Sequence, residues 1–403
     1  MRILVHDYAG HPFQVQLSRA LAAKGHEVNH AFASSLQTPR GELLRKRSDP
    51  ARFTVTEVPM DPNYPRFKYS FRKRRNMEVQ YGHEVARLIQ EWKPDSILSA
   101  NTPTETQQPI IESARKVGSR FAFWVQDFYS IAVDKLVRKK IPVIGRFVGG
   151  YYRYLDKRQL HQSDSVIAIT EDFKPLLTKE FNIPEDKVAV IPNWAPIESL
   201  PVLPKVNSWA KSQELSHKFV FLYTGTLGMK HNPNLLLQLA LKFKNHQDVQ
   251  VVVVSEGIGA EWLKAEREKY QLKNLVLLPY QPFDELPKVL ASGDVLISVL
   301  EEDAGVFSVP SKVLTYLCAQ RPLLLAVPNV NLAARIIDSE NAGLTVPPSD
   351  TQAFLHAAER FFENDAFRAE KAQNARIYAE KSFKIEEIVL KFDKILNNYN
   401  YNK

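Results

Sequence analysis

The sequence is poor in cysteine and in long apolar runs. Cys318 is its single cysteine, which excludes an internal disulfide and a cysteine metal cluster and suits a reducing compartment. No apolar run approaches the roughly 18 residues that span a bilayer. The N-terminal run MRILVHDYAG is interrupted by His6 and Asp7, so we interpret it as a first β-strand rather than a signal peptide. We expect a cytoplasmic protein without an integral membrane segment.

Several motifs of familiar sites are also absent. The loop after the first strand, DYAGHPF, offers only Gly10, so the GxGxxG motif of dinucleotide-binding proteins is missing. The chain has no GxxxxGKS or GxxxxGKT phosphate loop, no HExxH motif or Cys/His zinc spacing, and no GxSxG nucleophile elbow. These absences argue against dinucleotide, P-loop, zinc and serine-hydrolase chemistry.

Positive charge is unevenly distributed along the chain. The net charge of +8 lies entirely in residues 1–200, whereas residues 201–403 are neutral. Two segments, 66–75 and 135–158, interleave basic with aromatic side chains. This mixture suits an anionic membrane surface, where each basic residue contributes about 1 kcal/mol. A solvated helix face is the alternative interpretation, and nucleic acid, which the same mixture could bind, is not expected as a partner.

Short β-branched runs alternate with helical patterns over the whole chain. At 403 residues, two domains are the natural expectation. A polar segment with several prolines at 198–218 is typical of a linker, and the alternation restarts after it. The pattern predicts two Rossmann-like α/β halves with parallel sheets, whose ligands bind at the carboxyl ends of the strands. The predicted strands are 2–5, 27–32, 96–99, 121–124, 165–169, 188–191, 219–223, 249–254, 275–278, 295–299 and 323–327.

Two such halves without the motifs excluded above favour nucleotide-sugar chemistry, and seven sequence blocks support this interpretation. They include VAVIPNWAP, LYTGTLGMKHNPNLLLQLA and VPSKVLTYLCAQRPLL. In this order they resemble the family-four retaining glycosyltransferases of the GT-B fold, most closely the bacterial exopolysaccharide, colanic-acid and fucosamine transferases. The blocks lie at 21–28, 188–196, 222–240, 255–263, 278–300, 309–324 and 341–350.

The resemblance implies two Rossmann-like domains that face each other across a cleft. It assigns an acceptor domain to 1–198, a donor domain to 199–383, and a C-terminal helix at 384–403 that packs back on the first domain. The implied reaction is retaining transfer from a nucleotide diphosphate sugar to a glycan or polyprenyl-linked acceptor in cell-surface polysaccharide synthesis. UDP is favoured over GDP as the nucleotide, and neither a metal nor a cofactor is expected. Whether the protein also binds peripherally to the inner face of the plasma membrane is left open.

On the donor side, the resemblance places two cations near the diphosphate. Lys230 follows a strand, and Lys312 lies with Ser311 where a loop becomes a helix, so free N–H groups and the helix dipole favour an anion there. Electrostatic stabilisation of the departing phosphate by these groups is the implied catalytic contribution. The full implied donor set is Gly10, Gly225, Thr226, Glu256, Tyr280, Ser308, Pro310, Ser311, Val313 and Thr315.

On the acceptor side, His11 is the strongest candidate for chemistry, because it begins the first helix after the first strand. Asp127 follows another strand and is implied to orient the acceptor or a histidine. Asn101 stands where many relatives have a histidine; it can orient a hydroxyl but cannot act as a base. Thr102 adjoins it as a second acceptor contact.

One departure from the family pattern leaves alternatives open. The two glutamates that members often carry before and within the donor helix are replaced by Phe307 and Thr315. Glu302 or Asp303 is an alternative sugar contact. A catalytically silent assembly partner and a nucleotide-sugar epimerase or hydrolase therefore remain alternatives to a transferase.

Overall fold

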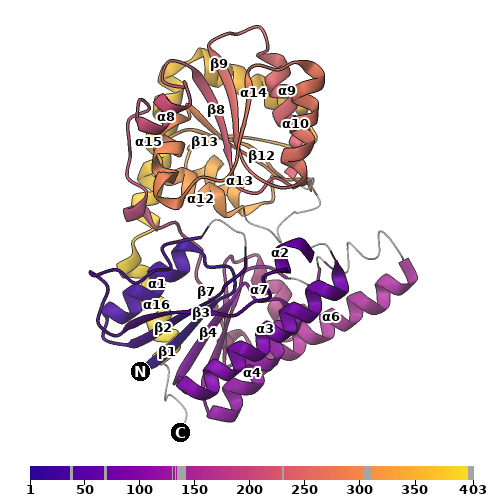
Figure 1. Ribbon diagram of the computed structural model, residues 1–403, viewed down its shortest axis with the longest axis vertical. Coiled ribbons are helices and arrows are strands. Elements are labelled where there is room, and N and C mark those ends of the chain that lie inside the picture. Colours follow the sequence, from indigo (N-terminus) through magenta and orange to yellow (C-terminus); the bar gives the residue numbers. More distant parts are fainter. Residues whose placement is uncertain are drawn as a thin grey trace. The chain divides into compact units, whose positions relative to one another are not determined.

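The computed structural model describes residues 1–36, 40–67, 70–128, 130, 131, 133, 142–228, 231–302 and 310–397, with the backbone alone for 142–144. The chain divides into two compact units (Figure 1). Unit 1 comprises Met1–Pro192 together with Ile385–Lys403, and unit 2 comprises Asn193–Lys384. Unit 2 thus begins at Asn193, whereas the expected second domain begins at 199, and Trp194 and Ala195 near its start are buried.

Unit 1 is built on a seven-stranded sheet in the order β3-β2-β1-β4-β5-β6-β7, in which all neighbouring strands are parallel. The strand order reverses between β1 and β4, which makes the carboxyl ends of these two strands the switch point where such sheets bind ligands. The strands are β1 (Arg2–Asp7), β2 (Glu27–Ala33), β3 (Phe53–Val58), β4 (Ser96–Ala100), β5 (Arg120–Val125), β6 (Ser165–Ala168) and β7 (Val188–Val190).

Helices cover both faces of this sheet (Figure 1). Helices α3, α4 and α6 lie side by side, with α4 in contact with both of the others. Among the described residues, the α-helices of unit 1 are α1 (Pro12–Ala23), α2 (Tyr64–Phe67), α3 (Phe71–Trp92), α4 (Thr104–Val117), α6 (Pro142–Gln162), α7 (Phe173–Pro175) and α16 (Ile385–Asn397).

The last helix, α16, returns to unit 1 and contacts α1, β4 and β5. Its buried side chains, Ile388, Val389, Phe392 and Leu396, recur at helical spacing and form one apolar face. The ring of Phe392 lies 4.7 Å from that of Trp124 on β5. Apolar packing therefore fixes the C-terminal helix to the first unit.

Unit 2 contains a six-stranded parallel sheet in the order β10-β9-β8-β11-β12-β13, with its switch point between β8 and β11. Its strands are β8 (Phe219–Thr224), β9 (Val249–Val254), β10 (Leu275–Leu278), β11 (Val295–Val299), β12 (Leu323–Ala326) and β13 (Gly343–Val346). Its helices are α8 (Ser208–Ser212), α9 (Pro233–Lys242), α10 (Ile258–Tyr270), α11 (Leu286–Ser292), α12 (Ser311–Cys318), α13 (Leu332–Ser339), α14 (Thr351–Glu363) and α15 (Asp365–Ser382).

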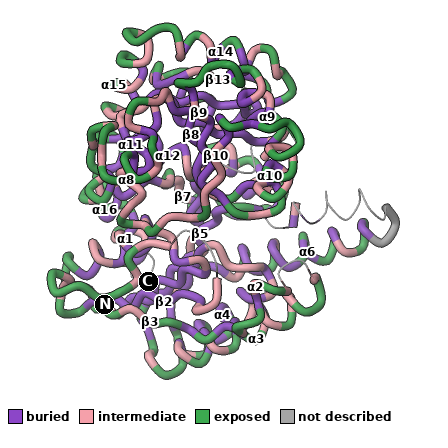
Figure 2. Tube along the Cα trace, turned by 45° about the horizontal axis from the view of Figure 1, so that its top comes forward, coloured by how far each residue is buried: buried purple, intermediate pink, exposed green. Residues whose placement is uncertain are grey.

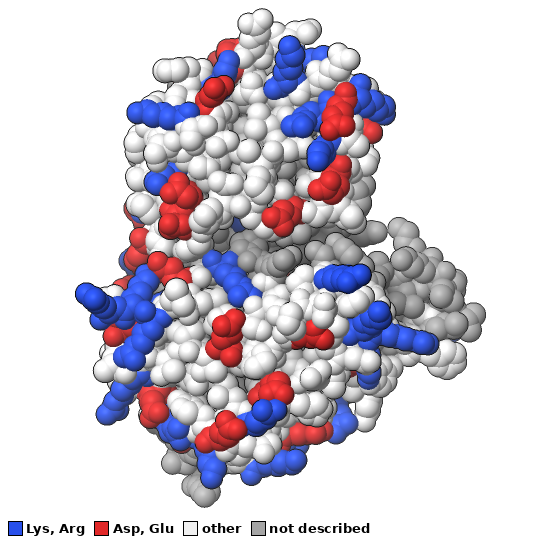
Figure 3. Space-filling view, in the orientation of Figure 1, with Lys and Arg blue, Asp and Glu red and all other residues white. Residues whose placement is uncertain are grey.

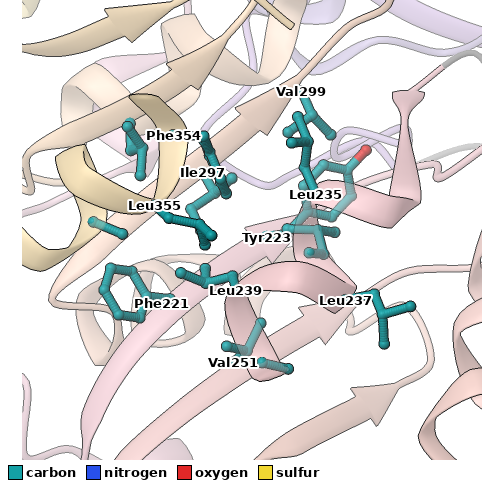
Figure 4. Packing of buried hydrophobic residues seen from close by; sticks show 14 of the residues in the cluster. Phe221, Tyr223, Leu235, Leu237, Leu239, Val251, Ile297, Val299, Phe354 and Leu355 are labelled. Carbon is teal, nitrogen blue, oxygen red and sulfur yellow. The ribbon is translucent and has the colours of Figure 1, made fainter. Parts of the chain in front are cut away.

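The core of unit 2 lies between the sheet and the helices that cover it. Figure 4 shows Phe221, Val251 and Ile297 of the sheet beside Leu239 of α9 and Phe354 of α14. Buried residues follow the strands and the inner helix faces, and exposed ones lie outside (Figure 2). This two-sided burial explains why the strands read as near-continuous apolar runs.

The predicted fold class is confirmed, since both units are parallel α/β sheets of Rossmann type. Residues 198–218, interpreted as a linker, belong instead to unit 2. Trp209 and Leu215 are buried there, and Asn207 caps α8 through its side chain. The linker prediction was wrong because it rested on the polar and proline-rich composition of the segment, in which Trp209 and Leu215 are isolated apolar residues.

Candidate functional site

In unit 2, a glycine allows the predicted lysine to approach the end of β8. Gly225 adopts φ +101°, a left-handed conformation that favours glycine, and its N–H donates to the carbonyl of Val254 at 3.0 Å. A Cβ at this position would lie 3.3 Å from Cε and 3.4 Å from Nζ of Lys312. The loop after β8 and the start of α12 are therefore in direct contact.

The Lys312 ammonium lies against a buried aromatic ring. Its Nζ is 3.7 Å from the ring centroid of Tyr223, which is fully buried on β8 and donates its hydroxyl to the Thr226 carbonyl at 2.9 Å. A cation over an aromatic face is stabilised by the negative face of the ring. The contact holds the ammonium at the carboxyl end of β8, one residue into α12.

A second tyrosine ties α12 to the same strand end. Tyr316 lies one turn after Lys312 and accepts a hydrogen bond from the N–H of Thr224 at 2.8 Å. Its hydroxyl also donates to the Thr224 carbonyl at 3.2 Å. Burial raises the pKa of Tyr316 to about 12, so the hydroxyl stays protonated at neutral pH and serves as donor. Sequence reasoning did not single out Tyr223 or Tyr316.

Three further predicted donor residues lie at neighbouring strand ends. Thr226 follows β8, and its Oγ1 lies 2.7 Å from the hydroxyl of Tyr280, which follows β10. Glu256 follows β9, and its carbonyl accepts the N–H of Leu227 at 3.2 Å. Burial raises the pKa of Tyr280, so this hydroxyl is also neutral. The structure thus gathers Thr226, Glu256 and Tyr280 with Lys312 at one edge of the sheet.

The predicted donor residues on α12 differ in exposure because the helical period turns them to different sides of the helix. Ser311 is exposed, whereas Lys312 and Thr315 are half-buried. Val313 does not fit the prediction, because its side chain is in the core and its N–H already donates to the carbonyl of Pro310 at 2.9 Å. Pro310 precedes the helix and carries no N–H to offer.

Some sequence predictions fall on residues that the structure does not describe. Lys230 and Ser308 lie outside the described residues, as do Phe307 and Asp303. Their predicted roles remain hypotheses from the sequence.

In unit 1, the loop after β1 is organised around a buried carboxylate. Asp7 is fully buried and accepts the N–H groups of Ala9 and His11. Its Oδ1 lies 3.3 Å from Nδ1 of the His11 ring, and the same ring nitrogen lies 3.2 Å from Nδ2 of Asn101. His11 and Asn101, which follow β1 and β4, therefore meet at the switch point of the sheet.

Gly10 is explained by packing within unit 1. It adopts φ +77°, and a Cβ there would lie 2.8 Å from Cδ1 of Leu43. Its carbonyl accepts the N–H of Gly41 at 3.0 Å. Gly10 was predicted to contact the donor. In the structure it is buried, and its backbone instead packs closely against residues 41–43.

A buried polar network around His6 lies next to the loop that follows β1. Nδ1 of His6 lies 3.0 Å from the Ser99 hydroxyl, and Nε2 lies 2.9 Å from that of Tyr81. The Thr102 hydroxyl lies 3.2 Å from the same Nδ1 and donates to the Ala100 carbonyl at 3.1 Å. Burial lowers the pKa of His6 to about 4, so its ring is neutral at physiological pH. The network fixes the Thr102 hydroxyl against its own strand.

A cavity of about 230 Å³ opens beside these residues and collects three of the predicted ones, Asn101, Thr102 and Asp127. It also contains Asp156 of α6, which was not predicted from the sequence. Asp156 accepts the Thr104 hydroxyl at 2.9 Å, and burial raises the pKa of its carboxyl group. The remaining lining residues are Pro103, Thr104, Phe123, Trp124, Val125, Gln126, Phe128 and Leu160.

Two Rossmann-like units in one chain are the architecture of the GT-B class. Residues 11–194 match the glycosyl transferase 4-like domain, and residues 207–382 match the glycosyl transferases group 1 family. The chain therefore belongs to the family-four glycosyltransferases, as the sequence motifs predicted.

The chain is similar in sequence to two curated relatives and in fold to a solved structure. The chain is 26% identical over 231 residues to the putative colanic acid biosynthesis glycosyl transferase WcaI of Escherichia coli K12, covering 55% of this chain and 54% of WcaI. It is 24% identical to the probable glycosyltransferase WbjE of Pseudomonas aeruginosa, covering 67% of each. The match thus spans about half the length of WcaI. The fold of Anabaena HepE, solved with UDP and glucose, is similar with a TM-score of 0.73 at 14% identity, covering 99% of this chain and 100% of that one.

Proposed function

We propose that this chain is a retaining glycosyltransferase that moves a sugar from a UDP-sugar to a glycan or lipid-linked precursor in cell-surface polysaccharide synthesis. The observation that carries the proposal is the convergence of Lys312, the start of α12 and the polar residues Thr226, Glu256 and Tyr280 at the strand ends of unit 2. A cation at a helix N-terminus suits a diphosphate. The name of WcaI and the UDP bound to HepE support the pathway and the nucleotide.

The proposed reaction is front-face transfer without an enzyme nucleophile. The bond between the anomeric carbon and the diphosphate oxygen breaks, and its electron pair leaves with the phosphate. The acceptor oxygen bonds to the same face of that carbon, and its proton passes to the departing phosphate oxygen. Lys312 stabilises the negative charge that develops, a contribution typically worth about 10²–10³ in rate.

We further propose that this charge is neutralised by protein groups, so that no metal is required. Lys312 lies over the Tyr223 ring and beside Gly225, and α12 begins at the preceding residue, Ser311. Lys230, from the sequence, is the proposed second cation. Such preorganised groups need no reorganisation when the bond breaks.

A thermal-shift screen of UDP, GDP and ADP, each with and without EDTA, tests this donor site. UDP should raise the melting temperature most, because a ligand at a hundred times its Kd stabilises the folded state by about 2.7 kcal/mol. EDTA should leave the shift unchanged. A shift by ADP alone, by none of the three nucleotides, or only with divalent metal would contradict the proposal.

Exposed aromatic and basic side chains on α6 favour an acceptor that lies at a membrane. Phe147 and Tyr154 are 78% and 62% exposed, and Tyr151, at 47%, lies between them on the same helix face. Arg146 and Arg153 are exposed beside this stripe. Large aromatics rarely stand exposed together on a soluble surface, whereas an aromatic and basic stripe suits a lipid interface.

A basic segment at the start of α3 extends the same type of surface. Arg72 and Lys73 are exposed next to Phe71, which is 49% exposed. Figure 3 shows Lys and Arg side chains on several parts of the visible face of unit 1, with Asp and Glu side chains between them. Parts of the predicted basic segments, residues 68–69 and 135–141, lie outside the described residues. We propose that α6 and the start of α3 contact anionic lipid.

Sedimentation with vesicles of phosphatidylglycerol or phosphatidylcholine tests this surface. The protein should sediment with the anionic vesicles, and the double variant Phe147→Ser, Tyr154→Ser should lose most of that binding. Tyr270→Ser, at a 38% exposed tyrosine of unit 2, is the matched control and should bind normally. Equal binding by all three proteins would contradict the proposed surface.

A further inference from the structure

The carboxylate of Asp7 has an environment that suits an orienting group. It lies at the carboxyl end of β1, is fully inaccessible to solvent, and receives two backbone N–H groups from its own loop. A buried charge is tolerated only when hydrogen bonds or opposite charge compensate it. The side chain that completes this compensation is His11, whose Nδ1 lies 3.3 Å from Oδ1.

The surroundings keep Asp7 ionised. Burial by itself would raise the pKa of the carboxyl group, but the hydrogen bonds from His11 and the nearby His11 and His30 rings outweigh it and lower the pKa. The group is therefore a carboxylate at neutral pH and can only accept hydrogen bonds. Asp7 therefore cannot be the donor in its hydrogen bond with the His11 ring.

This restriction selects one tautomer of His11. In the neutral ring only one nitrogen carries a proton, and the hydrogen bond of the other nitrogen decides which one. Asn101 also faces Nδ1, but a side-chain amide can turn its oxygen toward the ring, whereas a carboxylate offers only oxygens. The carboxylate therefore favours a proton on Nδ1, between Asp7 and Asn101. Nε2 is left as a hydrogen-bond acceptor on a side chain that is 30% exposed.

We propose that Asp7 is a positioning residue that fixes His11 with an unprotonated Nε2, which accepts a hydrogen bond from a sugar hydroxyl at the switch point of unit 1. The proposal rests on the proposed transferase function for the identity of the hydroxyl. Asp7 itself touches no substrate and acts through the orientation and tautomer of His11. This arrangement also explains why the loop DYAGHPF carries an aspartate four residues before the histidine.

Histidine-selective ¹⁵N NMR tests the tautomer without any ligand. Spectra are recorded above the titration range of histidine, and the His11 signals are assigned as those lost in His11→Gln. The native protein should show the proton on Nδ1, and Asp7→Asn should move the population toward the Nε2–H form. A native Nε2–H tautomer, or a spectrum unchanged in Asp7→Asn, would overturn the proposal.

Turnover measurements provide the second readout. UDP release from UDP-glucose should show kcat/KM about tenfold to a hundredfold lower in Asp7→Asn, since a charge-assisted hydrogen bond is removed. The same change in a His11→Gln background should add little, because Asp7 acts through that ring. Full additivity of the two changes would contradict the proposal. If the native protein releases no UDP, the transferase function fails while the NMR result still decides the role of Asp7.

Asp49→Asn is the matched control for the loss of a buried carboxylate in unit 1. Asp49 accepts Nε of Arg19 at 2.7 Å and the N–H of Lys46 at 2.8 Å, away from His11. It should lose stability but keep the native His11 tautomer. A similar tautomer change in this variant would show that general loosening of unit 1, and not Asp7, controls the ring.

Discussion

Lys312→Met should lower kcat by about 10²–10³ while the protein remains folded, since that is the typical cost of removing one group that stabilises transition-state charge. Methionine retains an apolar stem that can pack on Tyr223, so the substitution removes the ammonium with little loss of packing. The measurement is UDP release from UDP-glucose at saturating donor, together with the melting temperature.

The matched control is Lys288→Met, at a half-buried lysine of α11 that pairs with Glu285 at 2.7 Å. Surface pairs of this kind contribute about 0–1 kcal/mol, and Lys288 does not belong to the predicted donor set. It should turn over at the native rate. Native turnover in Lys312→Met, or an equal loss in both variants, would contradict the role assigned to Lys312.

Phe392→Ala should destabilise unit 1 by about 3–5 kcal/mol, the usual cost of truncating a fully buried phenylalanine. Its ring is inaccessible to solvent, and its centroid lies 4.7 Å from that of Trp124 on β5, where α16 packs on unit 1. Equilibrium unfolding in urea should show the transition of unit 1 shifted, whereas the transition that UDP stabilises, that of unit 2, should stay in place.

Leu390→Ala is the control on the same helix, because Leu390 is 55% exposed. Its effect should remain within about 0.5 kcal/mol, as expected for a surface substitution. Equal destabilisation by both changes would mean that α16 contributes helix propensity alone and not the apolar packing described above.

The sequence predicted the central strands of both sheets because they are buried on both faces. The two strands it missed, β3 and β13, are edge strands. In β3 only Phe53 and Val58 are buried, and in β13 only Gly343 and Val346. The other two edge strands, β7 and β10, were predicted because their sequences VAV and LVLL are apolar throughout. Polar residues or glycine interrupt FTVTEV in β3 and GLTV in β13, so the apolar signal of these two strands is too weak for a periodicity argument.

The family resemblance named Lys312, Thr226 and Tyr280 directly, and their roles in donor binding stay predictions. The structure places them at the strand ends of unit 2, where Thr226 contacts Tyr280 and Lys312 lies beside Gly225. Val313 was misassigned, because a motif gives sequence neighbours whereas the helical period decides which of them faces the core.

Supporting residues were harder to find. Tyr316 and Asp7 act through contacts to residues distant in sequence or to backbone groups, and neither belongs to a motif with that function. The spacing of Tyr316 four residues after Lys312 was the only local signal. Asp7 was first interpreted as the end of an apolar run.

Calorimetric titration of UDP into the native protein and into Lys312→Met tests the central claim most directly, because it measures the diphosphate site without requiring the acceptor. The account predicts that UDP binds the native protein in the absence of metal and that the affinity falls at least about tenfold in the variant, as expected for loss of a charged contact. Equal UDP affinity in the two proteins, or no UDP binding to the native protein, would contradict it.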